Sequence, residues 1–368
     1  MTTTTAKLPD GRTRVTISDP AQFITAIPCL VGFRPENSIV LIGLGGDGGG
    51  GVTSILRADL PPAEREADAV EFITDTLCRS PGAEVLIVVV GRHPGHPPCS
   101  KSPPHARLVR RIAGAFRKRG RRADYAAWTS EIRGGNHWRT YRPDSPVSEG
   151  ILPDENSTVL AAVCAAEGMV TFDSRAELEQ LLEPDDPSAH EKRARLLDAA
   201  VEALSPDIMP ADTYEECARI VRAAIDQVRR GDLSFTDEQV VRLALALSNP
   251  QVRDSCLGTA VPHTSDRSRH ARRLWLELVR LTPPPERAEA AVLLCYAAYM
   301  HGEGSFALMA AENALDADPS HRLAFLLRAC LMNGQPPEDL RCLTDRVTDL
   351  YRPAALRGHL PASEETEV

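Results

Sequence analysis

One stretch of eighteen residues, from Ile27 to Leu44, constrains the fold of this chain more than any other. Just before it, Asp19 and Pro20 are typical of a helix start, because a carboxylate oxygen accepts from free backbone N–H groups and proline fits the first turn. Gly32 and Pro35 then end that helix and turn the chain. The segment from Ser38 to Leu44 is a continuous apolar run of strand length between turn residues, which predicts a fully buried strand.

The first half of the chain alternates strand and helix patterns. Val85 to Val90 is the strongest strand signal, and its unbroken apolar character predicts a central strand covered on both faces. Strands are expected near residues 14–17, 38–44, 52–60, 85–90, 124–131 and 137–141, the last two joined as a hairpin. Helices are expected near residues 19–30, 61–78, 104–119 and 157–167, with another from 174. This alternation predicts an α/β fold with a mixed sheet and flanking helices.

The second half shows only helical patterns. They lie near residues 188–204, 211–230, 236–248, 267–281, 286–301, 304–316, 320–333 and 337–351. Ala307, Ala314 and Pro319 have the spacing of one tetratricopeptide-like helix pair, in which small residues let two helices approach and proline closes the second. The sequence therefore predicts an α/β domain over residues 1–185, an all-helical, helical-repeat-like domain over 186–360 and an acidic tail over 361–368.

Composition places the chain among globular proteins of the cytoplasm. Hydrophobic residues make up 43% and charged residues 25% of the chain, and no apolar run reaches the ~20 residues that a membrane helix needs. The N-terminus lacks the apolar core of a signal peptide. The nine cysteines are scattered without CxxC spacing, which indicates free thiols in a reducing compartment.

Positive charge is concentrated between Arg92 and Arg142. This region holds thirteen Lys and Arg against Asp124 and Glu131, whereas the whole chain has a net charge of −9. The densest part is a basic patch of Arg110, Arg111, Arg117, Lys118, Arg119, Arg121 and Arg122. Three interpretations stay open: a solvated helix end or a patch docked on the acidic helical half of the same chain, a site for an acidic protein partner, and a nucleic-acid site.

Two further groups of residues could bind ligands. Arg34, Asn37, Ser38 and Arg92 are expected at one edge of the sheet, where the arginines could meet an anionic small molecule. His93, His96 and Cys99 have side chains that ligate zinc, but they form one cluster in a proline-rich stretch, whereas tight structural sites pair two clusters. No metal or other cofactor is therefore predicted.

Three groups of residues resemble a known family. The first group runs from Val15 to Pro20 and continues through Ile27-Pro28 and Leu30 to Ser38. The second combines Trp138, Tyr141, Gly150 and Pro153, and the third combines Gly302, Gly304, Ala307 and Asp318-Pro319. Together they resemble the actinobacterial domain-of-unknown-function family numbered 4192 over most of the chain. The resemblance implies architecture and supplies no catalytic residues, and Cys29 departs from it by replacing an expected aromatic residue.

The sequence predicts a cytoplasmic protein-interaction or regulatory module without catalysis of its own. It contains neither a Gly-x-Ser-x-Gly elbow nor an HExxH motif, and its helical domain is expected to bind a protein partner. Two alternatives remain: an enzyme or sensor that binds an anionic small molecule at the sheet edge, and a nucleic-acid-binding protein that uses residues 92–142.

Overall fold

The computed structural model describes residues 4–7, 13–45, 51–92, 102–142, 147–166, 170–184, 186–203, 210–345 and 350. The chain divides into two compact units. Unit 1 is Met1–Leu178 with Met332–Pro336, and unit 2 is Glu179–Leu331 with Pro337–Val368. The predicted boundary between residues 185 and 186 falls between helix α5 (Arg175–Gln180) and helix α6 (Pro187–Glu202). The predicted acidic tail lies outside the described residues.

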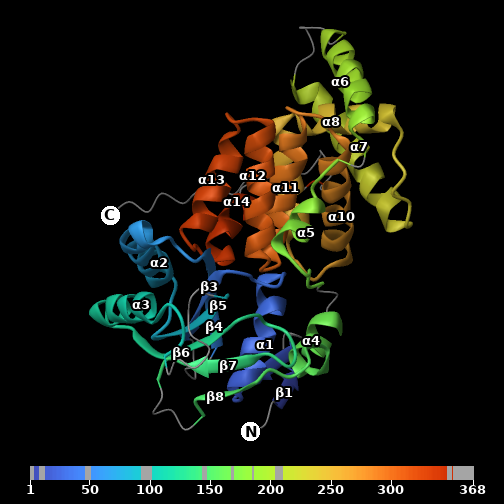
Figure 1. The fold of residues 1–368 in the computed structure, drawn as a ribbon. Helices are drawn as coiled ribbons and strands as arrows, with labels where there is room; N and C mark the ends of the chain where they lie inside the picture. Colours follow the sequence, from blue (N-terminus) through green and yellow to red (C-terminus); the bar gives the residue numbers. More distant parts are fainter. Residues whose placement is uncertain are drawn as a thin grey trace, which may run out of the picture. The chain divides into compact units, whose positions relative to one another are not determined.

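Unit 1 is built on a mixed sheet of six described strands. Its order is β4-β3-β5-β6-β7-β8, and β5 and β6 pair in parallel while the other neighbours pair antiparallel. The strands are β3 (Ser38–Gly45), β4 (Gly51–Asp59), β5 (Glu84–Val90), β6 (Arg122–Thr129), β7 (His137–Thr140) and β8 (Glu149–Ile151). A separate antiparallel pair consists of β1 (Thr4–Lys7) and β2 (Thr13–Thr16). Helices follow in unit 2, so the predicted α/β part followed by a helical part is confirmed (Figure 1).

Strand β5 is central and covered on both faces, as its apolar run predicts. Val85, Ile87 and Val89 share a buried cluster with helix α2 (Glu66–Arg79) and helix α3 (Ala106–Lys118). The side chains of Val88 and Val90 alternate to the opposite face and are also buried. Helices α1 (Pro20–Val31) and α4 (Val159–Ala166) lie on that side of the sheet in Figure 1.

The start and end of α1 follow the local signals in the sequence. The carboxylate of Asp19 accepts from the Ala21 N–H at 2.9 Å, and Pro20 occupies the first turn. Gly32 ends the helix with a φ of 91°, a left-handed conformation that favours glycine, and its N–H donates to the Pro28 carbonyl. The chain then pairs with a distant segment, because the Arg34 N–H donates to the Phe172 carbonyl at 2.9 Å.

Unit 2 packs around helix α11, which is buried on nearly every side. Ala307 and Ala314 of α12 are fully buried where α12 packs on α11, which is the small-residue contact that the predicted helix pair needs. The helices of this half are α6, α7 (Pro210–Arg229), α8 (Asp237–Leu247), α9 (Pro250–Leu257), α10 (Asp266–Leu281), α11 (Arg287–Met300), α12 (Gly304–Ala317), α13 (Arg322–Met332) and α14 (Cys342–Asp345).

Some elements differ from the sequence prediction or are absent from it. Strand β8 has only three residues and β1 is rich in threonine, so neither carries an apolar pattern of its own. Helix α9 is too short to show a helical periodicity in the sequence. Only its cap marks it: the Asn249 side chain accepts from the Gln251 N–H at 3.0 Å, and Pro250 occupies the first turn. The segment predicted as one helix over 337–351 begins instead with a 3-10 turn, Pro337–Arg341, before α14.

Candidate functional site

Arg34, a predicted ligand-binding residue, is the centre of an ion-pair network inside unit 1. Its two terminal nitrogens donate to both carboxylate oxygens of Glu155 at 2.9 and 3.0 Å. One of them also donates to Asp173 at 2.9 Å and the other to the Ile132 carbonyl at 3.0 Å. The Arg34 side chain is only 7% exposed. The guanidinium thus meets two carboxylates of its own chain at the place where the sequence predicts an anionic ligand.

The other predicted residues of the sheet edge shape the turn into β3. Asn37 has a left-handed φ of 42°, and its carbonyl accepts from the Leu60 N–H at 2.9 Å. The buried hydroxyl of Ser38 accepts from Arg57 Nε at 2.9 Å. Ser38 pairs with Val90, so the turn lies at the same end of the sheet as the exposed Arg92. Ligand binding at this edge stays a prediction.

Several residues of the basic patch make contacts within unit 1. Arg110 donates to the Ala106 carbonyl of its own helix, and Arg117 and Lys118 are exposed. The other four residues contact neighbours: Arg111 with Glu66 (3.0 Å), Arg119 with Asp75 (2.5 Å), Arg122 with Glu84 (2.8 Å) and Arg121 with the carbonyls of Cys78 and Ser80. The three carboxylate partners lie in unit 1 and not in the helical half of the chain, and exposed ion pairs of this kind contribute little to stability. A role of the patch in binding a partner or nucleic acid stays a prediction.

The predicted metal ligands His93, His96 and Cys99 lie outside the described residues. Within the described ranges, no group of three or more His, Cys, Asp or Glu side chains is placed to hold a metal ion.

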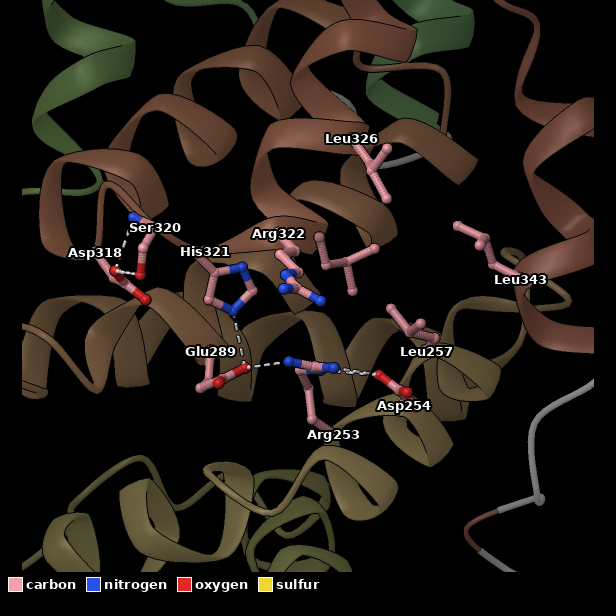
Figure 2. A pocket seen from close by; sticks show the side chains of 11 residues that line it. Arg253, Asp254, Leu257, Glu289, Asp318, Ser320, His321, Arg322, Leu326 and Leu343 are labelled. Atoms are coloured by element: carbon pink, nitrogen blue, oxygen red, sulfur yellow. Dashed lines mark hydrogen bonds and ion pairs between the residues drawn. The ribbon is translucent and has the colours of Figure 1, made fainter.

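A hollow of about 480 Å³ lies within unit 2 (Figure 2). Four elements and one turn contribute to it: α9, α11, α13, α14 and the turn before α13. Its lining residues are Arg253, Asp254, Leu257, Glu289, Asp318, Ser320, His321, Arg322, Leu323, Leu326 and Leu343. Charged side chains and leucines are thus combined in one place, and the volume falls in the range of ligand pockets.

Hydrogen bonds and ion pairs join four side chains along one side of the hollow. One oxygen of Glu289 accepts from His321 Nε2 and from the Arg253 guanidinium, both at 3.1 Å. Arg253 also pairs with Asp254 at 2.8 Å (Figure 2). Burial alone would lower the pKa of Arg253, but the charges of Glu289 and Asp254 outweigh it and raise the pKa. Arg253 therefore remains charged and holds the two carboxylates in place.

His321 is held through both ring nitrogens. Its Nδ1 accepts from the Ala324 N–H at 3.1 Å, so the ring proton lies on Nε2 and is donated to Glu289. The ring is 7% exposed. Neighbouring Ser320 points elsewhere, because its hydroxyl donates to Asp318 at 2.7 Å. Hydrogen bonds from the Ser320 hydroxyl and N–H lower the pKa of Asp318, which therefore stays a carboxylate.

The apolar side of the hollow comes from leucines of different elements. Leu257 ends α9 and is buried, whereas Leu323 and Leu343 are half-buried. Leu326 of α13 is 57% exposed. Burying such a side chain would be favourable, so this wall offers an apolar contact to whatever enters the hollow.

Sequence reasoning missed the charged residues of this hollow. Arg253 and His321 lie 36 and 32 residues from Glu289, and no local spacing connects them. One signal was present, since Asp318-Pro319 belongs to the third group of family-like residues and Asp318 borders the hollow. That pair marks the turn that places His321.

Comparison with known proteins identifies the family. A family model described as "Domain of unknown function (DUF4192)" matches residues 20–338. The chain belongs to this family. The match covers the Arg34 network and nearly the whole hollow, and the resemblance seen in the sequence is thereby confirmed. No curated protein and no solved structure matches the chain. Among the described residues of this DUF4192 protein, no helix combines the length and apolarity needed to cross a membrane.

Proposed function

We propose that this DUF4192 protein is a non-catalytic interaction module whose helical unit binds a peptide segment of a partner protein. The peptide would present a carboxylate beside one or more apolar side chains. The observation that carries the proposal is the combination, in one hollow, of a leucine wall that includes the exposed Leu326 and an uncommitted guanidinium, that of Arg322.

The charges of the hollow favour an acidic group on the partner. Asp254, Glu289 and Asp318 are each engaged by Arg253, His321 or Ser320. Arg322 is exposed, and no ion pair joins it to another residue of the described ranges. A carboxylate that enters the hollow would therefore meet a free cation, and a guanidinium can bind it through two parallel hydrogen bonds.

The leucines supply the affinity that one exposed charge pair lacks. A surface ion pair contributes about 0–1 kcal/mol, whereas burying a leucine contributes about 1.5–3 kcal/mol. Leu326 is the most exposed of the leucines that line the hollow, and Leu343 of a different helix lines the same hollow (Figure 2). An apolar side chain from a partner would be held between them, while Arg322 sets the orientation of the peptide.

The arrangement of His321 supports binding over catalysis. A general base needs a free nitrogen within reach of its substrate. Both nitrogens of His321 are committed, and Ser320 Oγ is bound to Asp318. The proposal also places the protein in the cytoplasm of an actinobacterium, in keeping with its free cysteines and its family resemblance.

A library of random peptides displayed on phage, selected on the full-length protein, tests this proposal. We expect enriched peptides to carry Asp or Glu near Leu, Ile or Phe. Arg322→Glu and Leu326→Asp should each weaken the binding of an enriched synthetic peptide by about tenfold or more, measured by fluorescence anisotropy.

Two variants of the same helix serve as controls. Arg328 and Phe325 lie on α13 but do not line the hollow. Arg328→Glu and Phe325→Asp should therefore keep the affinity within about threefold. If selection enriches no peptide, or if the enriched peptides bind equally well to Arg322→Glu and Leu326→Asp, the hollow is not the binding site.

A further inference from the structure

Two cysteines of unit 1 lie in direct contact although they are far apart in the sequence. Cys29 belongs to α1 and Cys164 to α4, and these helices pack against each other (Figure 1). The side chains of Cys164 and Thr171 both lie within hydrogen-bonding reach of the Cys29 sulfur. Cys29 is half-buried and Cys164 is 5% exposed. Cys29 is thus partly open to solvent, whereas Cys164 is buried close to it.

We propose that Cys29 and Cys164 form a dithiol centre that hydrogen peroxide oxidises to a disulfide. This activity belongs to unit 1 and is independent of peptide binding in unit 2. Cys29 would be the attacking thiolate because solvent reaches it, and Cys164 would be the resolving thiol because it is buried in contact with Cys29.

The reaction needs peroxide and no other reactant. The Cys29 thiolate attacks one peroxide oxygen, the O–O bond breaks, and the departing hydroxide takes a proton to become water. The product is a sulfenic acid on Cys29. The Cys164 thiol then loses its proton, its sulfur attacks the Cys29 sulfur, and the S–O bond breaks with release of a second water. The two thiols lose two electrons, and one peroxide gains them.

The surroundings of Cys29 favour its thiolate. The hydrogen bond from Cys164 lowers the pKa most, burial opposes it, and further hydrogen bonds from Thr171 and from the backbone N–H of Cys29 bring the pKa to about 6. The charge of Glu155 acts in the opposite direction, but that carboxylate is itself held by Arg34. A thiol with this pKa is largely ionised at neutral pH, whereas an ordinary cysteine is mostly protonated.

Three other described cysteines differ from Cys29 in burial or in pKa. Burial raises the pKa of Cys256 and of Cys295 far above the ordinary value, so both are inert thiols. Cys342 is exposed, its thiol donates a hydrogen bond to the Asp339 carbonyl, and Cys330 lies near it, which makes Cys342 the control for an accessible thiol outside the proposed centre. If solvent exposure alone set the rate of oxidation, Cys342 would be oxidised first. If the dithiol centre sets the rate, Cys29 is oxidised first.

The experiment is a peroxide titration of the reduced full-length protein at pH 7. Remaining thiols are alkylated, the protein is digested without reductant, and the peptides are identified by mass spectrometry. We expect a cross-linked pair containing Cys29 and Cys164, lighter by two hydrogen atoms than the free peptides, to form about tenfold faster than any oxidation of Cys342. Alkylation of Cys29 should be half-maximal near pH 6, against about 8.5 for the cysteine of an unstructured model peptide in the same tube.

Variants separate the two steps. Cys164→Ala should leave a sulfenic acid on Cys29 that dimedone traps, Cys29→Ala should abolish the cross-link, and Cys342→Ala should leave its rate unchanged. The peptide map of the oxidised wild-type protein shows whether Cys29 and Cys164 are cross-linked, even if a variant does not fold. Oxidation of Cys342 ahead of the pair, or oxidation of Cys29 without a cross-link to Cys164, would overturn the proposal.

Discussion

Arg34→Met is expected to lower the free energy of unfolding of unit 1 by about 3 kcal/mol, the low end of the cost of breaking a buried ion pair. The substitution removes the four hydrogen bonds that join Arg34 to Glu155, Asp173 and the Ile132 carbonyl. It leaves the Glu155 carboxylate, only 28% exposed, without its cation. Urea unfolding followed by hydrogen exchange and mass spectrometry measures the effect, because exchange assigns the loss of protection to residues 32–34 and 170–174 of unit 1.

Three variants test whether the network causes the loss. Arg34→Lys should fall between wild type and Arg34→Met, because an ammonium cannot form the two parallel hydrogen bonds to Glu155. Glu155→Gln added to Arg34→Met should recover part of the loss by removing the stranded charge. Arg133→Met, which removes an exposed pair with Glu131, should change little. Unfolding of Arg34→Met at the wild-type urea concentration would show that the network does not stabilise unit 1.

Gly150→Ala is expected to lower the free energy of unfolding of unit 1 by about 2 kcal/mol, a typical cost of overpacking a filled site. Gly150 of β8 lies opposite Trp138 of β7. A Cβ at Gly150 would lie 2.8 Å from Trp138 Nε1 and 3.3 Å from Cε2. The indole is only 1% exposed and cannot move aside without disturbing the sheet. Thermal and urea unfolding measure the loss.

Two further substitutions check the cause. Gly114 lies within α3, and a Cβ added there would meet open space, so Gly114→Ala should stabilise the protein by up to ~1 kcal/mol. Trp138→Phe combined with Gly150→Ala should cost less than the sum of the two changes, because the smaller ring makes room for the methyl group. Additive costs would contradict the steric explanation, and so would loss of exchange protection in regions far from β7 and β8.

Arg34 shows where sequence reasoning succeeds and where it stops. The sequence predicts the turn around it, since Gly32 ends α1 and Ser38 begins β3 as expected. The sequence does not predict the residues that surround its guanidinium, because Glu155 and Asp173 are 121 and 139 residues away. The basic patch is similar: the arginines are plain in the sequence, but their partners Glu66, Asp75 and Glu84 come from α2 and β5.

The sequence by itself determined the local elements of this protein. Asp19 and Pro20 start α1, Gly32 ends it, and the apolar run of Val85 to Val90 becomes the central strand, because caps, turns and periodic burial depend on near neighbours. Only the tertiary structure decided which side chains meet. The proximity of Cys29 to Cys164 and the hydrogen bonds that join Arg253, Glu289 and His321 depend on how whole helices pack. That packing is set by the sum of many apolar contacts and leaves no local pattern at the residues it brings together.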